Sequence, residues 1–297
     1  MPWKECNRGG ALKIREKLIR NYPQVKPPAR STVHAVLDRH GLVKRRKRRR
    51  YKARGTDLHH AKRPNELWCA DYKGEFKMGN KQYCYPLTIT DYHSRYLIAC
   101  EALSTTKETY AHTVFEQAFK EFGLPDAIRT DNGVPFSSAK ALFGLSKLSI
   151  WWLRLGIKIE RIKPGNPQQN GRHERMHLTL KKEATKPPGY NFLQQQSKFD
   201  DFIDEYNHDR LHQALSMKYP GELYTPSARV YRPPDDPEYP LHDHTIRVFA
   251  GQLVGIREVE DKLWLVSFLD FDLGYFDEED CRVEPLDNPF NVNVLPM

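Results

Sequence analysis

Residues 164–182 limit the possible fold most strongly, because this segment must change from an irregular loop into a helix. Three of its first four residues are proline or glycine, which neither continue a strand nor sit inside a helix. Asn170 is a good N-cap residue, and residues 171–186 contain no further proline. The pattern predicts a polar loop that ends at Asn170 and a helix that carries Glu174 in its first turn or so.

Glu174 is a lone carboxylate among cationic or neutral neighbours, a setting that suits a divalent metal beside phosphate groups. The simpler interpretation is a solvated glutamate on a charged helix. We interpret the flanking His173 and His177 as phosphate contacts or packing residues and not as metal ligands. The basic or neutral neighbours of Glu174 are Arg172, His173, Arg175, His177 and, two turns further on, Lys181.

Two aspartates elsewhere in the chain raise the significance of Glu174. Asp71 lies in a short apolar run, residues 67–74, that is typical of a strand, and Asp131 lies where a second run ends in a turn. Two aspartates at strand ends and a glutamate on a later helix form the hard-oxygen set that Mg²⁺ or Mn²⁺ prefers. Asp91 has an equally motif-like setting, and we assign it to a turn.

Three segments together resemble the retroviral-integrase-like catalytic core of bacterial insertion-sequence transposases. They are residues 68–71 (Trp-Cys-Ala-Asp), 130–133 (Thr-Asp-Asn-Gly) and 164–174. The resemblance covers roughly residues 62–226. It implies a ribonuclease H-like fold in which Asp71, Asp131 and Glu174 are the catalytic residues and bind two Mg²⁺ or Mn²⁺ ions. Asp131 and Glu174 are 43 positions apart, more than in the commonest family pattern, and the extra residues fall within 137–156.

The order of apolar runs predicts an α/β fold with a mixed five-stranded sheet and helices on its faces. Asp71 and Asp131 are then expected on neighbouring strands, with Glu174 brought in by the later helix. The expected strands are 67–76 and 82–90, joined in a hairpin about Gly79, then 96–103, 126–130 and 157–162. The expected helices are 106–122, 137–155 and 191–215.

Charge divides the chain into unlike parts. Residues 1–64 carry 20 Lys and Arg against 4 Asp and Glu, whereas residues 233–297 carry 4 against 15. A basic block of this kind usually meets nucleic acid. We expect four regions: a helix-turn-helix-like basic arm (1–61), the catalytic core (62–230), a proline-rich linker (231–242) and a small SH3-like β-barrel (243–297). The acidic charge of the last region favours a protein contact over phosphate binding.

Two short helices are expected in the arm, residues 11–21 and 32–40, with Ser31 as an N-cap. They suggest a helix-turn-helix with the second helix in the recognition position, although an ordinary helical pair is the alternative and a third helix is not found. Seven consecutive cations follow and favour DNA. The candidate DNA-binding residues are Lys44, Arg45, Arg46, Lys47, Arg48, Arg49, Arg50, Asn132, Gln168, Asn170, Arg172 and Lys181.

Cysteine usage and hydropathy indicate the compartment. The five cysteines include no Cys-x-x-Cys pair, so no zinc site is recognisable. Cys69, Cys84 and Cys100 fall in expected strands, where reduced thiols act as small hydrophobic groups. No apolar run approaches the ~20 residues of a membrane span, and no signal peptide is visible. We expect a soluble bacterial protein of the cytoplasm, associated with the nucleoid.

The combined hypothesis is a transposase that nicks the ends of an element and joins them to target DNA. The expected partners are double-stranded DNA, both element ends and target, and further copies of this chain, with no membrane and no small-molecule cofactor. One alternative is a catalytically silent DNA-binding relic or repressor of transposition. The other is a nuclease that cuts RNA strands, which would need the metals but no basic arm.

Overall fold

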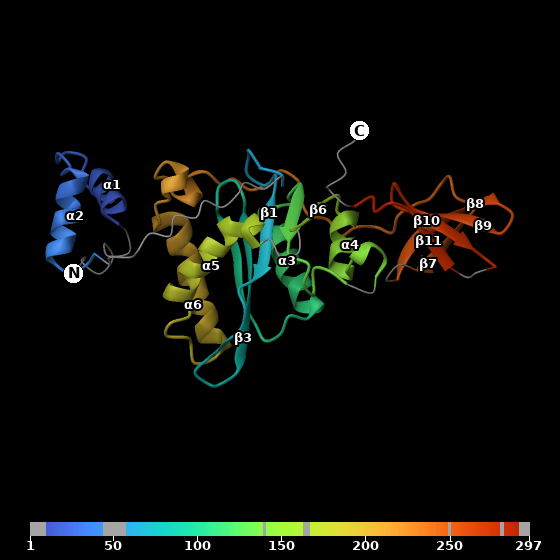
Figure 1. Cartoon of the computed structure of the whole chain (residues 1–297), viewed down its shortest axis with the longest axis horizontal. Coiled ribbons are helices and arrows are strands. Elements are labelled where there is room, and N and C mark those ends of the chain that lie inside the picture. The colour runs from blue at the N-terminus through green and yellow to red at the C-terminus, as the bar shows by residue number, and fades with distance from the viewer. Residues whose placement is uncertain are drawn as a thin grey trace.

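The computed structural model describes residues 10–43, 58–138, 141–162, 167–248, 251–279 and 282–290. A helical pair lies at one end of the molecule, a mixed sheet with its helices lies in the middle, and a second sheet lies at the other end (Figure 1). The central sheet positions the candidate site.

The central sheet has the order β4-β3-β1-β5-β6, and the short β2 extends the line of β1 along β3. β1, β3 and β4 pair antiparallel through short connections, whereas β5 pairs parallel with both β1 and β6, and α4 lies in the connection from β5 to β6. This confirms the predicted mixed α/β sheet. The strands are β1 (Trp68–Tyr72), β2 (Phe76–Lys77), β3 (Tyr83–Asp91), β4 (Leu97–Leu103), β5 (Ala127–Thr130) and β6 (Lys158–Arg161).

Helices cover both faces of this sheet (Figure 1). On one face α3 (Glu108–Phe122) and α4 (Lys147–Arg154) bury aromatic side chains such as Phe115 and Trp152 against β1, β3 and β5. On the other face α5 (Gly171–Glu183) and α6 (Phe192–Asp204) enclose a second cluster that includes Phe199. Each fully buried aromatic side chain contributes about 1.5–3 kcal/mol relative to exposure.

Three predicted elements are longer than those observed. β1 ends at Tyr72 because Gly74, at φ +85°, turns the chain before β2. In place of a helix over 137–155, a 3-10 turn precedes α4, where the Ser146 side chain accepts the Ser149 N–H. The helix expected over 191–215 stops being α-helical at Asp204 and continues only as a short π-turn.

The N-terminal pair consists of α1 (Ala11–Asn21) and α2 (Arg30–Arg39). α2 begins before Ser31, so the N-cap position falls on Ala29 and not on Ser31 as predicted. Arg20 attaches α1 to the core: its Nη1 lies 2.7 Å from Glu222 Oε1, and its Nη2 donates to the Met217 carbonyl at 3.0 Å. The run Lys44–Arg50 lies outside the described residues, so its role stays a prediction.

The C-terminal strands form one antiparallel sheet in the order β11-β10-β9-β8-β7. β7 and β11 are the edge strands of this sheet in the described residues. The small SH3-like β-barrel expected from the sequence is not confirmed and stays a prediction. The strands are β7 (His244–Val248), β8 (Gln252–Glu260), β9 (Leu263–Phe268), β10 (Phe271–Asp277) and β11 (Arg282–Pro285).

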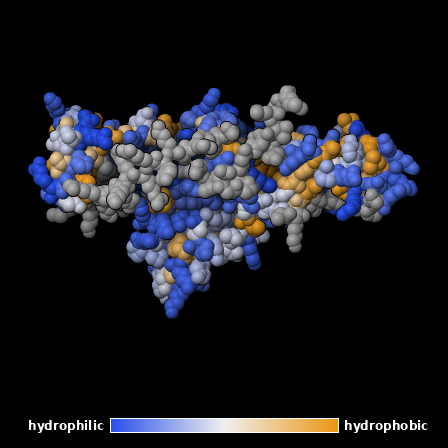
Figure 2. Space-filling view, in the orientation of Figure 1, coloured by the Kyte–Doolittle hydropathy of each residue, from blue (hydrophilic) through white to orange (hydrophobic). Residues whose placement is uncertain are grey.

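The surface alternates between polar and apolar patches along the molecule (Figure 2). Cys69, Cys84 and Cys100 are buried free thiols in the central sheet, as expected, whereas Cys6 and Cys281 lie outside the described residues. In the part of the chain that the structure describes, no helix has both the length and the apolar character to cross a membrane.

Candidate active site

Asp71 and Asp131 lie side by side at the ends of two neighbouring strands. Asp71 is the fourth residue of β1, and Asp131 directly follows β5. These strands pair in parallel with Cys69 opposite Arg129, so the two aspartates stand two residues further along at matching positions. Because side chains alternate between the faces of a sheet, both aspartates occupy the same face. The structure therefore brings the two aspartates together as expected.

The turn after β5 holds the Asp131 carboxylate in place. The Gly133 N–H donates to Asp131 Oδ1 at 3.1 Å. A Cβ atom at position 133 would lie 3.0 Å from Asp131 Oδ2, closer than real Cβ contacts permit without movement. Glycine at this position therefore leaves the carboxylate room to take up its orientation.

Glu174 lies in the first turn of α5, and two histidines attach that helix to the same sheet face. The Nε2 atoms of His173 and His177 each lie 2.7 Å from Thr88 Oγ1, and His173 Nδ1 lies 2.8 Å from Thr90 Oγ1. Thr88 is the residue paired with Asp71 across β1 and β3. The histidines thus place the start of α5 beside Asp71.

Burial keeps both histidines neutral. His173 is 1% exposed, and burial followed by the charge of His177 sets its pKa well below the ordinary value. Burial, with a smaller effect from Lys73, lowers the pKa of His177 to about 3. Of the two roles considered from the sequence, the packing role is the one that this geometry supports, because neither ring is placed to meet a phosphate in solvent.

The three carboxylates act on one another electrostatically. Burial, the charge of Asp131 and, more weakly, the charge of Glu174 raise the pKa of Asp71 to about 7. Among the described residues, no three His, Cys, Asp or Glu side chains lie close enough to form a finished metal site. The set still fits Mg²⁺ or Mn²⁺, because the ligands are hard oxygens whose mutual repulsion a divalent cation would relieve.

Three arginines, Arg95, Arg172 and Arg175, lie close together near the start of α5. Arg95 follows β3 with φ +63°, and its Nε is buried without a hydrogen-bond partner in the described structure. Burial, and then the charges of Arg172 and Arg175 among others, lower its pKa. Arg95 was not among the candidates predicted from the sequence. The motif-like segment around Asp91, which ends at Arg95, was the sequence feature that could have indicated it.

A second pair of cations lies further along α5. Burial and then the charge of Lys181 lower the pKa of Lys73, which directly follows β1. Lys181 was a candidate DNA contact, and Lys73 was not. Lys73 follows Asp71 by two residues along the chain, and Lys181 lies on α5, the helix that carries Glu174.

The remaining candidates are scattered. Asn132 is exposed, and its Nδ2 donates to the Ile162 carbonyl at 2.7 Å. Asn170 is buried at the N-cap of α5 but makes no capping bond, and its Nδ2 has no partner in the described structure. The side chain of Gln168 lies outside the described residues. Asp91 accepts the N–H groups of Asn65 and Ser94, which agrees with the turn role assigned to it.

A mixed sheet of this order, with aspartates at two adjacent strand ends and a glutamate on the helix that follows, defines a ribonuclease H-like domain with an acidic centre. Two family models agree with this class. Both are described as "Integrase core domain", and they match residues 61–167 and residues 155–220. Residues 61–220 of the chain therefore form an integrase core domain.

The curated relatives are retroviral. The Gag-Pol polyprotein of Baboon endogenous virus (strain M7) and the Pol polyprotein of Feline endogenous virus ECE1 are each 33% identical over 124 residues, or 42% of this chain. Those matches span 7% and 11% of the two polyproteins. These two relatives support the integrase core, and both are retroviral.

The comparison with solved structures gives integrases. The HTLV-2 integrase catalytic core domain in complex with magnesium, in its trimeric form, is 19% identical with a TM-score of 0.44, covering 56% of this chain and 100% of that one. A simian T-cell lymphotropic virus intasome, in complex with PP2A regulatory subunit B56 gamma, is 16% identical with a TM-score of 0.49. It covers 87% of this chain and 93% of that one.

Proposed function

We propose that the chain is a transposase of the Asp-Asp-Glu type, a metal-dependent polynucleotidyl transferase that nicks element ends and joins them to target DNA. One observation carries the proposal: residues 61–220 match an integrase core domain, and within it burial and then the charges of Asp131 and Glu174 raise the pKa of Asp71. The assignment to an insertion sequence rests on the motif resemblance alone, because the relatives named above are retroviral.

The roles of the residues follow from their positions. Asp71 and Asp131 would hold the metal ions from the sheet, and Glu174 would complete the set from α5. When bound, two divalent ions supply a nucleophile of lowered pKa and stabilise the leaving oxygen. The carboxylates act as ligands throughout, so none of them needs to form a covalent bond to DNA. Gly133 keeps Asp131 oriented, and His173 keeps α5 in place.

The cations beside the centre would bind the DNA backbone. Arg95, Arg172 and Arg175 gather near Glu174, and Lys73 lies with Lys181 further along α5. Bringing like charges together costs free energy, which phosphates would recover through contacts and counterion release. We propose double-stranded DNA as the partner, with the basic arm binding element ends and several copies of the chain holding two ends together.

The test is strand nicking and joining on labelled duplexes that carry the ends of the element encoding this chain. The wild-type chain, Asp71→Asn and Glu174→Gln are compared with Mg²⁺, with Mn²⁺ and with EDTA. We expect metal-dependent products from the wild type, none from either variant, and DNA binding by all three. Products that survive Glu174→Gln would overturn the assignment of the three carboxylates. Binding without products in the wild type would instead favour a silent DNA-binding protein.

A further inference from the structure

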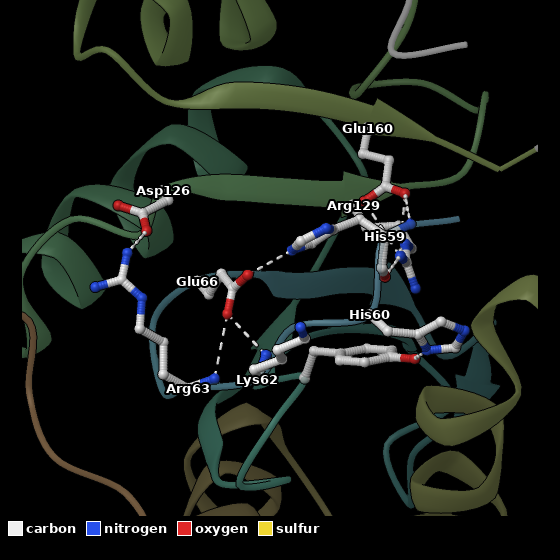
Figure 3. Close-up of polar contacts among 9 residues, drawn as sticks. His59, His60, Lys62, Arg63, Glu66, Asp126, Arg129 and Glu160 are labelled. Carbon is white, nitrogen blue, oxygen red and sulfur yellow. Dashed lines mark hydrogen bonds and ion pairs between the residues drawn. The ribbon is translucent and has the colours of Figure 1, made fainter. Parts of the chain in front are cut away.

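The chain enters the core through a short segment that lies on the same sheet face as α5. We call residues 58–63 the strap. Leu58 and Ala61 of the strap are buried, and Ala61 packs in a small cluster with Cys69 of β1 and with Tyr92. Figure 3 shows the strap passing over the sheet among its polar partners. The strap is therefore part of the packed core and not a loose connection.

A buried ion pair holds the backbone of the strap at His59. Arg129 of β5 and Glu160 of β6 are 1% and 3% exposed, and their side chains are 3.0 Å apart (Figure 3). Arg129 Nη2 also donates to the His59 carbonyl at 2.6 Å, and the His59 N–H donates to Glu160 Oε1 at 3.2 Å. Both backbone groups of one strap residue are thus held by the two halves of the pair.

Glu66 fixes the turn that follows the strap. Its carboxylate accepts the N–H of Lys62 at 2.7 Å and of Arg63 at 3.2 Å, and it lies 2.7 Å from His59 Nε2 (Figure 3). Backbone N–H bonds to a carboxylate of this kind specify one loop conformation. The strap consequently has a defined course up to the start of β1.

Tyr92 is the side chain at which the strap and α5 meet. It directly follows β3, and it packs with Cys69 of β1 and with Ala61 of the strap. Its hydroxyl lies 2.7 Å from His60 Nδ1 of the strap. The Arg172 guanidinium lies 4.0 Å from the centre of its ring, and Arg172 Nη1 donates to the Tyr92 carbonyl at 2.9 Å. Arg172 is two residues before Glu174.

We propose that Tyr92 is a positioning residue for Glu174, an inference that rests on the proposed function. Glu174 has to approach Asp71 and Asp131 for the three carboxylates to share metal ions, and Arg172 fixes the turn of α5 that carries it. A guanidinium stacked on a buried ring and bonded to the same residue's carbonyl has little freedom to move. The strap contacts the other end of Tyr92, so the segment that leads from the basic arm is linked to the catalytic helix.

The experiment measures Mn²⁺ binding without DNA, as the rise in melting temperature of the full chain with Mn²⁺ concentration. Tyr92→Leu removes the ring, and Arg172→Gln removes the cation from an exposed position, so at least one variant should fold. We expect each to weaken the apparent Mn²⁺ affinity by roughly tenfold. Tyr92→Phe keeps the ring and should bind Mn²⁺ nearly as the wild type does.

Tyr96→Leu is the matched control, because Tyr96 is partly buried, packs on Tyr224 away from α5 and makes no contact with Arg172. It should lower the melting temperature without changing the Mn²⁺ affinity. Wild-type Mn²⁺ affinity in both Tyr92→Leu and Arg172→Gln would overturn the positioning role. Asp71→Asn separates this outcome from a failure of the proposed function: if Asp71→Asn also binds Mn²⁺ like the wild type, the metal site itself is wrong.

Discussion

At the scale of single residues, the site contains charged groups that lie beside groups of the same charge. Asp71 is buried next to two further carboxylates, and Arg95 is partly buried next to two further guanidinium groups. Such arrangements destabilise the folded chain when no ligand is bound. Like charges repel each other, and burial disfavours the charged form of each group. They are typical of functional sites, where a bound ligand supplies the missing charge.

Gly133→Ala tests how closely the turn holds Asp131. The added Cβ would lie 3.0 Å from Asp131 Oδ2, so the carboxylate has to shift by a few tenths of an ångström. We expect strand transfer to fall by roughly tenfold or more, since misplaced ligands lose catalytic geometry. Rates are measured with labelled duplexes at saturating Mg²⁺. Gly171→Ala is the control, because nothing lies within 4 Å of a Cβ there, and an equal loss in both variants would contradict the prediction.

Arg95→Gln tests the phosphate contact. Losing one backbone contact should weaken DNA binding about equally for all sequences and reduce the slope of log affinity against log salt by about one. Binding is measured by fluorescence anisotropy over a range of salt concentrations. Lys120→Gln on α3, where Lys120 pairs with Glu116 on the other face of the sheet, should change neither quantity. An unchanged slope for Arg95→Gln would exclude a phosphate contact by this residue.

At the scale of elements, the strap and α5 share one sheet face and the hydrophobic helices α3 and α4 take the other. Burying the polar face costs free energy, because the charges of Arg129 and Glu160 lose their hydration. Their position is explained by the strap, whose backbone groups they satisfy.

Glu160→Gln tests how much the buried ion pair of Arg129 and Glu160 contributes to the free energy of unfolding. Removing one partner leaves the Arg129 charge buried without compensation, which we expect to lower the free energy of unfolding by about 3–5 kcal/mol. Urea denaturation measures the change. Asp126→Asn, which loses the exposed bond to Arg63 at 2.8 Å, should cost less than about 1 kcal/mol. Similar losses in the two variants would show that burial does not govern the strength of the pair.

At the scale of the whole molecule, the basic arm docks on the core through α1, and the second sheet joins the opposite end through the linker. Arg154 of α4 donates to the linker carbonyls of Pro234 and Asp235 at 3.2 and 2.8 Å. The buried cluster of the central sheet includes Val254 and Phe268 of the second sheet. The core and the C-terminal region, which the sequence predicted as separate domains, therefore pack against each other.

His212 makes stability depend on pH where the arm meets the core. Burial and then the charges of Lys13, Arg95 and Arg210 lower its pKa to about 3. The unfolded chain binds a proton to this residue below about pH 6.5 and the folded chain does not, so falling pH disfavours folding. Relative to His212→Gln, the wild type should lose roughly 1.4 kcal/mol of unfolding free energy per pH unit between pH 6 and 4. Urea denaturation at several pH values measures this difference, and parallel curves for the two proteins would contradict it.

Much of the secondary structure was predictable because it depends on local pattern. Short apolar runs predicted five strands of the central sheet, and helical spacing predicted α1 and α3. The Asn170 N-cap, with no proline in the residues that follow, predicted α5. The errors fell where local signals compete with packing. Phe143 and Gly144 interrupt the expected helix over 137–155 with positive φ. The helix expected over 191–215 stops being α-helical at Asp204.

The sequence by itself determined the class of site, because the types and order of Asp71, Asp131 and Glu174 already specify a hard-oxygen set. Only the tertiary structure decided which other residues join it. Arg95, Tyr92 and the strap come close to α5 through long-range packing of the sheet and α5, and sequence spacing carries no information about such contacts. Residue types determine which ligands a site can bind. The charges around the site, and the contacts that hold its residues in place, depend on which segments the fold brings together.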